Sequence, residues 1–502
     1  MLILSGSYSI DCFEFKKNNP PTQHLLMTNL AERRVEPSPH AQAQFAPEPS
    51  AARRSAAPPP PAPRRYHTIP LKFSVVVAFA AVWTALSIWL SQPWLRDLSA
   101  VTNLAFALTA IAFIAYVPGF MNAFLFGALL LDRRPVRVRP AAYPPVSILI
   151  AAYNEAPCIG ETLASLAAQD YAGRFEILVL NDGSTDDTAK VVREAMRDLA
   201  FPALASVRLL DHPVNAGKAA VLNRGLAAAA HDLIVTIDGD CWILPDGLTH
   251  LVERLLSDPP ETEAVAGAVM VRNARENFLT RSQEWDYFHG IAAVKRMQSM
   301  FHGTLVAQGA FSIYRRAALE DVGGWPACVG EDIVVSWALL KRGARVGYAE
   351  DAIAFTRVPE RLVQFAQQRR RWSRGLIEAF KAHGSLLFRR RLSTVFIWWN
   401  LCFPPMDAVY TFVFIPGLVL AAFGKFYVVG PLTLAVLPLG AIWNLFIFRI
   451  QRRTFHRERL TVRRNVGGFL FYAFAYNLLV QPVCVLGYAS ELIGLRKTWG
   501  SK

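Results

Sequence analysis

Three short acidic turns that contain glycine are the residues of this chain whose types and spacing could do chemistry. They are NDGS at 181–184, DGD at 238–240 and GED at 330–332. Carboxylates beside glycine at the ends of strands suit a nucleotide or a hydrated divalent cation, because Mg²⁺ takes oxygen ligands and is usually held by one or two carboxylates plus a substrate phosphate. A DGD tripeptide alone is also an ordinary polar turn, since Asp and Gly favour turns in any protein.

A basic stretch with a tryptophan, QQRRRWSRG at 367–375, is the second feature with chemical potential. The guanidinium fork of Arg371 suits a diphosphate, and an indole face such as that of Trp372 suits the apolar side of a pyranose ring. The alternative is an ordinary membrane anchor, because arginines often precede apolar helices on the cytoplasmic side. The flanking Gln368 and Trp372 favour the chemical role, and the other arginines of the run could face lipid headgroups.

An α/β domain between about residues 140 and 387 must position these side chains. PVSILIAAYNE, FEILVLNDGS and HDLIVTIDGD each predict a buried strand that ends in a turn, and helical stretches such as ETLASLAAQ and TAKVVREAMRDL lie between them. This alternation predicts a parallel sheet with right-handed crossovers. Ligands of such sheets bind beyond the carboxyl ends of the strands, where the acidic turns lie.

Long apolar blocks flank this domain. Apolar residues make up 53% of the chain and charged residues 18%, which indicates that part of the chain lies in lipid. Blocks 71–90 and 104–131 are each long enough to cross a bilayer, and further blocks lie at about 394–423, 428–448 and 466–492. Residues 398–407 could instead form a helix in the interface, because Pro404 and Pro405 break a straight span.

The charge pattern orients these blocks and separates classes of function. The net charge of +14 is concentrated beside the apolar blocks, which places both ends of the first hairpin in the cytoplasm and argues against nucleic-acid binding. Six widely spaced cysteines indicate free thiols. We expect a disordered cytoplasmic tail at 1–65, a two-helix transmembrane hairpin at 66–135, a cytosolic domain at 140–390, and an interface helix with about three transmembrane helices at 391–502.

The order YNE, DGS, NAGK, DGD, GED and QRRRW between membrane blocks resembles the processive, membrane-embedded family 2 glycosyltransferases. That family includes cellulose, chitin and hyaluronan synthases, and the chain looks most like the poly-β-1,6-N-acetylglucosamine synthases of biofilm exopolysaccharide. The resemblance covers about residue 71 to the C-terminus. It implies a GT-A-type, Rossmann-like cytosolic domain inserted between the transmembrane helices of a multi-pass protein of the plasma (inner) membrane.

The resemblance also implies roles for individual residues. The uridine and phosphates of a UDP-sugar would be held by Tyr153, Asn154, Glu155, Asp182, Lys218 and Asp238, although Lys218 could equally be a surface lysine. Asp238 and Asp240 would hold Mg²⁺ or Mn²⁺, and Asp332 would be the general base for the acceptor hydroxyl. The acceptor and pyrophosphate would meet Glu331, Gln368, Arg371 and Trp372. Glu331 could orient the base or cap a helix, and Asp407 could face a polymer channel or the interface.

The expected function is inverting, metal-dependent transfer from a UDP-sugar, most simply UDP-N-acetylglucosamine, to a growing β-linked polysaccharide that is exported across the membrane. One alternative is a hyaluronan-like or cellulose-like synthase. Another is transfer of one sugar to a lipid carrier, although enzymes that catalyse such a transfer usually lack Q-x-x-R-W. A further alternative is a transporter with a degenerate soluble domain. Such a domain should have lost its acidic turns, and this chain retains them. Expected partners are the UDP-sugar, the polysaccharide and the bilayer, with an accessory membrane subunit as a further candidate and no nucleic acid.

Overall fold

The computed structural model describes residues 14–15, 68–134, 137–458, 460–461 and 464–495. The predicted tail therefore lies outside the described residues, except for β1, which pairs antiparallel with β10. The strands are β1 (Glu14–Phe15), β2 (Val146–Ala152), β3 (Phe175–Asp182), β4 (Ala205–His212), β5 (Leu233–Asp238), β6 (Trp242–Ile243), β7 (Thr262–Val271), β8 (Phe311–Arg315), β9 (Arg345–Thr356) and β10 (Leu460–Thr461).

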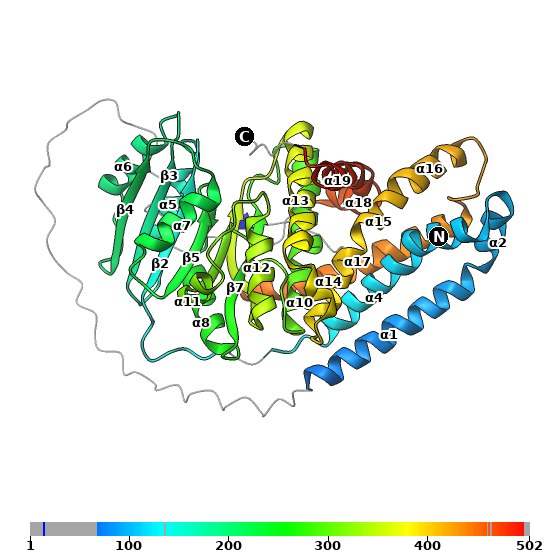
Figure 1. Ribbon diagram of the computed structural model, residues 1–502, viewed down its shortest axis with the longest axis horizontal. Coiled ribbons are helices and arrows are strands. Elements are labelled where there is room, and N and C mark those ends of the chain that lie inside the picture. The colour runs from blue at the N-terminus through cyan, green and yellow to red at the C-terminus, as the bar shows by residue number, and fades with distance from the viewer. Residues whose placement is uncertain (1–13, 16–67, 135–136, 459, 462–463, 496–502) are drawn as a thin grey trace, which may run out of the picture.

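Helices cover both faces of the main sheet and then continue into an apolar bundle (Figure 1). In the sheet domain they are α5 (Ile159–Ala167), α6 (Thr188–Asp198), α7 (Lys218–Ala228), α8 (Gly247–Ser257), α9 (Phe278–Trp285), the π-helix η2 (Asp286–Ala293), α10 (Val294–Met300), α11 (Arg316–Asp321), α12 (Glu331–Arg342), α13 (Leu362–His383) and the 3₁₀-helix η3 (Gly384–Phe388). In the bundle they are α1 (Ile69–Leu90), α2 (Gln92–Val101), α3 (Leu104–Ile111), η1 (Ala112–Tyr116), α4 (Val117–Leu130), α14 (Ser393–Leu401), α15 (Phe403–Val409), η4 (Tyr410–Phe414), α16 (Ile415–Ala422), α17 (Pro431–Arg457), α18 (Val466–Phe474) and α19 (Tyr476–Leu492).

Eight strands form the main sheet in the order β4-β3-β2-β5-β8-β7-β9-β6. The first four are parallel, as the sequence predicts. β8 runs antiparallel to both β5 and β7, and β6 runs antiparallel to β9. The parallel arrangement predicted for β2, β3 and β5 is therefore confirmed. The sheet as a whole is mixed, with β7 and β9 again parallel to each other.

Alternate side chains of the central strands build two separate cores. On β2, Ile148 and Ile150 pack with residues of α5 and α8, whereas Leu149 packs with residues of α7 on the opposite face. Successive side chains of a strand point to opposite faces, so a strand buried on both faces needs a continuous apolar run. The VSILIAA sequence of β2 supplies that run, and the polar turn that follows is placed at the edge of the sheet.

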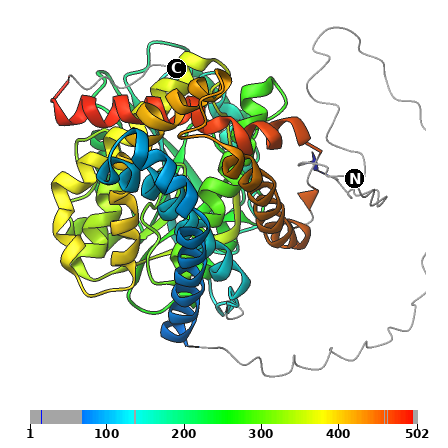
Figure 2. The same ribbon diagram turned by 90° about the vertical axis from the view of Figure 1, so that its right-hand side faces the viewer.

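Three helical segments are long and apolar enough to cross a membrane within the described residues: 69–90, 104–130 and 393–422. A fourth results if α18 and α19, which meet at a bend of 51°, count as one span. Figure 2 views the molecule from the side of these helices. Pro404 and Pro405 lie in the first turn of α15, where no intrahelical donor is lost, so the helical run from 393 to 422 continues past them. Block 428–448 falls mainly within α17.

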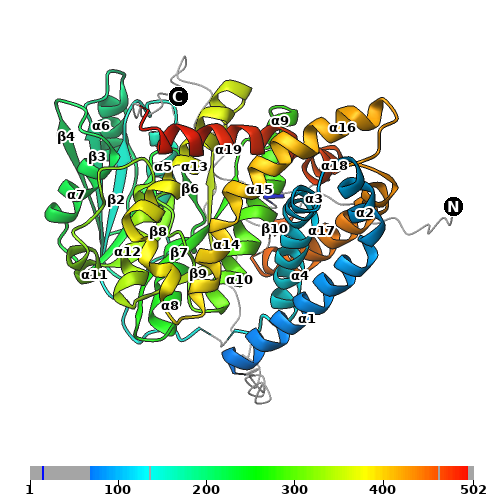
Figure 3. The same ribbon diagram turned by 45° about the vertical axis from the view of Figure 1, so that its right-hand side comes forward.

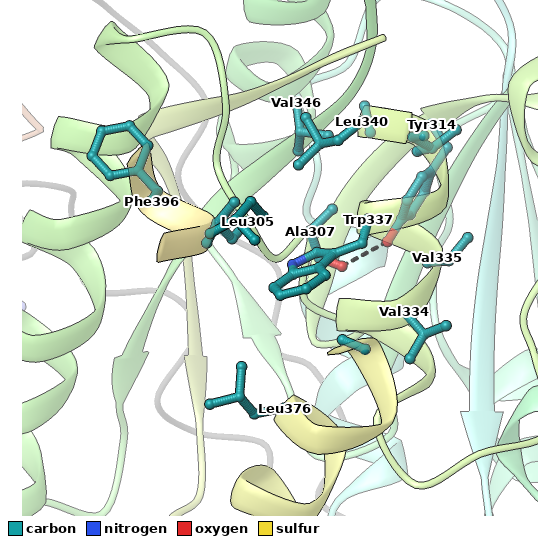
Figure 4. Close-up of a cluster of buried hydrophobic side chains, with 14 of the residues drawn as sticks. Leu305, Ala307, Tyr314, Val334, Val335, Trp337, Leu340, Val346, Leu376 and Phe396 are labelled. Carbon is teal, nitrogen blue, oxygen red and sulfur yellow. Dashed lines mark hydrogen bonds between the residues drawn. The ribbon is translucent and has the colours of Figure 1, made fainter. Parts of the chain in front are cut away.

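An apolar cluster joins the sheet domain to the bundle (Figure 4). Trp337 of α12 is fully buried among side chains that include Leu376 of α13 and Phe396 of α14. Beside it, the Tyr314 hydroxyl donates a hydrogen bond of 2.7 Å to the Ala307 carbonyl. In Figure 3, α19 lies against α13. The middle of α12 is therefore packed both against the sheet domain and against α13 and α14.

Candidate active site

The carboxyl ends of β2, β3 and β5 meet at one edge of the sheet. The strand register pairs Ala152 with Asn181 and Ala151 with Asp238, so the YNE, NDGS and DGD turns follow neighbouring strands. A Cβ on Gly239 would lie 3.0 Å from the Cγ of Glu155. The YNE and DGD turns are therefore in contact, as their predicted common role requires.

The turn after β2 is held by the segment that follows β3. Asn154 has a φ of 55°, in the left-handed region that Asn tolerates better than most residues. Its side-chain oxygen accepts a hydrogen bond from the Thr185 N–H at 2.8 Å, and the Thr188 hydroxyl accepts one from the Glu155 N–H at 2.8 Å. Tyr153 is 41% exposed at this edge. The turn is therefore fixed by the protein itself, with one aromatic side chain left accessible.

Asp182 holds the loop that leads into α7. Its carboxylate is buried, and its two oxygens accept hydrogen bonds of 2.8 Å from the N–H groups of Ala216 and Gly217. Gly217 has a φ of 89°, which favours glycine at this position. Lys218 is the next residue and the first of α7. In this structure Asp182 thus positions Lys218, in addition to any contact that it makes with a nucleotide.

Lys218 lies between two of the acidic turns. Its Nζ is 2.6 Å from Oδ1 of Asp238 and 3.4 Å from Oε1 of Glu331. Only 22% of its side chain is exposed, so the alternative of a surface lysine is wrong. Burial alone would lower the pKa of Lys218, but Asp238 and Glu331 outweigh burial and raise it. A Cβ on Gly309 would lie 2.6 Å from Nζ, so the loop before β8 closes over this ammonium.

The DGD turn has the donor set of a divalent-cation site. Asp238 already accepts a cation, the ammonium of Lys218, and its side chain is 34% exposed. Asp240 is more buried, and its Oδ1 accepts a hydrogen bond of 3.3 Å from the Thr356 hydroxyl. Two carboxylates from one turn, one of them accessible, fit Mg²⁺ or Mn²⁺ completed by substrate oxygens.

Glu331 and Asp332 form the first turn of α12, which a tight helix contact holds in place. A Cβ on Gly375 would lie 2.8 Å from the Cα of Gly330, and the Gly330 N–H donates a hydrogen bond of 2.8 Å to Glu378. α12 therefore meets α13 at two glycines. Glu331 contacts Lys218, and no side-chain hydrogen bond caps α12. Burial raises the pKa of Glu331 despite the opposing effect of Lys218.

α13 carries the basic motif with its tryptophan. Trp372 is 40% exposed, Arg371 is half-buried, and the buried Oε1 of Gln368 has no hydrogen-bond partner among the described residues. Tyr287 lies 6.3 Å from Trp372 between ring centroids. Burial raises the pKa of Tyr287, and the carboxylate of Asp240 adds to that rise. Tyr287 of η2 is thus a neighbour of the Trp372 ring.

Comparison with known proteins identifies the family. Residues 147–323 match the family described as Glycosyl transferase family 2. The chain is 32% identical over 231 residues to the poly-beta-1,6-N-acetyl-D-glucosamine synthase of Staphylococcus epidermidis, and 31% identical over 274 residues to that of Staphylococcus aureus strain COL. Residues 147–323 thus form a family 2 glycosyltransferase domain. These matches cover 46% and 52% of this chain and 54% and 64% of the relatives, so the chain spans less than two thirds of either relative.

A solved structure supports the fold of this glycosyltransferase. The mannosyltransferase PcManGT from Pyrobaculum calidifontis, in complex with GDP-Man and Mn²⁺, has a TM-score of 0.53 and 22% sequence identity. The match covers 77% of this chain and 99% of that one. The expected GT-A-type α/β domain, with long apolar helices before and after it in the sequence, is confirmed.

The sequence analysis missed two charged groups of the glycosyltransferase. Arg369 is buried and ion-paired with Asp286, so the expectation that the other arginines of the motif face lipid headgroups is wrong for Arg369. Lys295 of α10 is also buried, which lowers its pKa to about 7, with Asp332 opposing that shift. Asp286 and Lys295 each interrupt a largely buried helical stretch. A charge within an apolar helical stretch suggests a buried charge, and that signal was present in the sequence, but it does not identify a partner.

Two further expectations concern the membrane part and the cysteines. Asp407 is buried in α15 and accepts a hydrogen bond of 2.9 Å from the Tyr488 hydroxyl of α19, so it contacts a neighbouring helix. The five cysteines within the described residues are free thiols, as expected, and Cys12 lies outside those residues.

Proposed function

We propose that this protein transfers N-acetylglucosamine from UDP-N-acetylglucosamine to the end of a growing β-linked polysaccharide, with inversion at the anomeric carbon. The observation that carries the proposal is the contact of Lys218 with both Asp238 and Glu331, because it joins the DGD turn to the helix that bears Asp332. Similarity to two staphylococcal poly-β-1,6-N-acetylglucosamine synthases supports the choice of sugar.

The donor would lie across the carboxyl ends of β2, β3 and β5. The exposed ring of Tyr153 and the fixed YNE turn would hold the uridine, and Lys218 would leave Asp238 to meet the diphosphate. Asp238 and Asp240 would hold Mg²⁺ or Mn²⁺, which as a Lewis acid stabilises the negative charge of the leaving UDP. The side chains would thus collect positive charge where the leaving group develops negative charge.

Asp332 would act as the general base. Its carboxylate accepts the proton of the acceptor hydroxyl while the hydroxyl oxygen forms a bond to the anomeric carbon and the bond from that carbon to UDP breaks. A single displacement converts an α-linked donor into a β-linked product. A positioned base typically contributes about 10²–10⁴-fold to the rate. The first turn of α12 is a suitable place for a carboxylate, since the helix dipole stabilises negative charge there.

The polysaccharide would approach from α13. Trp372 offers a partly exposed indole face, and Arg371 would meet the pyrophosphate. α13 packs against α19, so the acceptor site adjoins the apolar helices. The positive charge beside the apolar blocks supports a catalytic domain on the cytoplasmic side of the plasma membrane. The product would then leave through the bilayer as it lengthens, alone or with an accessory membrane subunit.

The decisive experiment offers radiolabelled UDP-sugars one at a time to the detergent-purified full chain, with and without Mn²⁺. We expect metal-dependent incorporation from UDP-N-acetylglucosamine into a product that a β-1,6-specific N-acetylglucosaminidase digests. Polymer from another UDP-sugar would overturn the sugar assignment, and transfer of a single sugar to a lipid would overturn processivity.

The Asp332→Asn variant tests the general base. We expect transfer to fall by about 10²-fold or more, because the amide cannot accept the hydroxyl proton. UDP binding, measured by calorimetry, should stay within about twofold, since the fold and the DGD turn are untouched. Asp321→Asn, at the end of α11, is the matched control and should leave transfer unchanged. Full turnover by the Asp332 variant would remove Asp332 from the role of base.

A further inference from the structure

Arg369 has surroundings unlike those of the next arginine in its run. Its side chain is 7% exposed, and Nη2 lies 2.7 Å from Oδ2 of Asp286. Its guanidinium carbon lies 4.3 Å from the centroid of the Trp372 ring. Arg370, by contrast, is exposed and donates a hydrogen bond of 3.0 Å to the Ser490 hydroxyl. Arg369 thus stacks on the indole of Trp372, a residue that is 40% exposed.

The partner of Arg369 lies at a distinctive place in the fold. Asp286 is the first residue of η2, and π-helical turns are frequent at functional sites. A Cβ on Gly290 would lie 2.7 Å from Oδ1 of Asp286, so glycine leaves room for this carboxylate. The Tyr476 hydroxyl donates a hydrogen bond of 3.3 Å to Oδ2. Asp286 therefore connects α13 with the beginning of α19.

Tyr476 links this cluster to the bend between the last two apolar helices. It is the first residue of α19, directly after the 51° break from α18. Its ring lies 5.9 Å from the Arg369 guanidinium and 5.7 Å from the Phe365 ring. Further along, a Cβ on Gly487 would collide with the Ser373 hydroxyl. A continuous set of contacts therefore runs from the helix bend to Trp372.

We propose that Asp286 and Arg369 are positioning residues that set the plane of the Trp372 ring for the acceptor sugar and connect that ring to the bend between α18 and α19. This inference rests on the proposed function, in which Trp372 receives the end of the polysaccharide. Arg369 holds the indole on one face and is itself held by Asp286, which Tyr476 holds in turn. A displacement of the apolar helices at the bend would therefore tilt the acceptor platform.

Stability alone is a poor reason for this arrangement. Replacing both partners of a buried ion pair by well-packed apolar side chains is often neutral or stabilising, so burial of the pair is weak evidence for a purely stabilising role. A cation stacked on an indole fixes the ring by a directional contact that an apolar side chain would not supply.

The test compares Arg369→Met, Arg369→Lys and Asp286→Asn with Arg370→Met as the matched control from the same motif. For each detergent-purified full chain, the Kd for UDP, the Kd for a β-1,6-linked N-acetylglucosamine oligosaccharide, and the KM for that acceptor are measured. We expect Arg369→Met and Asp286→Asn to raise the oligosaccharide Kd and KM by about tenfold, with the UDP Kd within about twofold. Arg369→Lys keeps the charge but loses the planar stack, so it should fall between wild type and Arg369→Met.

Hydrogen–deuterium exchange supplies a readout independent of turnover. Arg369→Met and Asp286→Asn should increase exchange in peptides spanning 466–480, whereas Arg370→Met should not. Unchanged acceptor affinity or unchanged exchange in both variants would overturn the inference, as would equal losses of UDP and oligosaccharide binding. If the wild-type chain transfers sugar but Arg369→Met matches Arg370→Met, only this inference fails. If the wild type neither transfers any sugar nor binds the oligosaccharide, the proposed function fails, and this inference fails with it.

Discussion

The ammonium of Lys218 occupies space next to a carboxylate that we expect to bind a metal ion. Its Nζ lies 2.6 Å from Asp238, and the loop at Gly309 closes over it. Lys218 and a divalent cation would therefore compete for Asp238 until a diphosphate offers the ammonium another partner. This arrangement predicts that metal and nucleotide-sugar bind cooperatively.

Removing the ammonium should separate the two binding events. We expect Lys218→Met to tighten Mn²⁺ binding in the absence of nucleotide by about tenfold, which corresponds to about 1.4 kcal/mol, because the competing charge is lost. The same variant should weaken UDP binding, since the diphosphate loses a cation. Titration of Mn²⁺ followed by electron paramagnetic resonance measures the first effect. Lys190→Met, an exposed lysine of α6, is the control, and weaker Mn²⁺ binding by the Lys218 variant would contradict the prediction.

Lys295 makes stability depend on pH. Burial lowers its pKa from 10.5 to about 7, so between about pH 7 and pH 10.5 the unfolded chain binds more protons than the folded chain. The destabilising effect of Lys295 is therefore complete below pH 7 and fades as the pH rises toward 10.5. We expect Lys295→Met to raise Tm by several degrees at pH 6 and by clearly less at pH 9.

Differential scanning fluorimetry of the detergent-purified chain at the two pH values measures this difference. Lys341→Met, at an exposed position of α12, should show no such pH dependence. A stabilisation by Lys295→Met that is the same at pH 6 and pH 9 would show that the Lys295 ammonium keeps its ordinary pKa in the folded protein.

At the scale of elements, the contact between α12 and α13 sets the distance between the proposed base and the acceptor platform. Gly375 and Gly330 touch through their backbones, and neither can give way by rotating a side chain. We expect Gly375→Ala to separate the helices by a few tenths of an ångström or more and to lower the transfer rate by about tenfold, because small misplacements of reacting groups are costly.

The same variant should leave the Kd for UDP within about twofold, since the nucleotide site lies on the strand ends. Gly384→Ala is the matched control, because a Cβ there meets no atom within 4 Å. Transfer rates with UDP-N-acetylglucosamine measure both variants. An unaltered rate for Gly375→Ala would show that the helices tolerate greater separation than the contact suggests.

The central strands could be predicted from the sequence because β2, β3 and β5 are buried on both faces and therefore read as continuous apolar runs. β4 was missed, since it is the partly exposed edge strand and lacks such a run. The antiparallel strand β8 joins β5 from a distant part of the chain, and local periodicity contains no information on that pairing. The ion pair of Arg369 with Asp286 could not be predicted either, because the two residues belong to different helices and local sequence does not show which helices meet.

At the scale of the whole molecule, a buried network of charges joins the first apolar hairpin to the sheet domain. Arg134, four residues after α4, contacts Asp132 at 3.2 Å and Glu350 of β9 at 2.9 Å. Arg296 of α10 also contacts Asp132 and donates a hydrogen bond of 3.0 Å to the Thr454 hydroxyl of α17. Arg134 therefore ties the end of the hairpin to the sheet domain, in addition to adding positive charge beside an apolar helix.

Breaking this network should loosen the sheet domain from the hairpin without unfolding it, because the apolar cluster that contains Phe124 of α4 and Met297 of α10 still holds the two together. Removing one partner of a buried ion pair typically costs about 3–5 kcal/mol, since the remaining charge stays uncompensated. We expect Arg134→Met to speed trypsin cleavage between residues 131 and 146 several-fold and to shorten the polysaccharide product, while the Kd for UDP changes little.

Arg139→Met is the matched control, because the Arg139 side chain is 88% exposed and lies 3.9 Å from its nearest acidic partner. Gel analysis of timed digests and of product length would report both effects. In the proposed function, sugar transfer depends on the sheet domain and passage of the polymer on the apolar helices. A loosened junction should therefore reduce product length more than the initial rate of transfer. Equal losses of both, with cleavage between 131 and 146 unchanged, would show that Arg134 acts on the catalytic site and not on the junction.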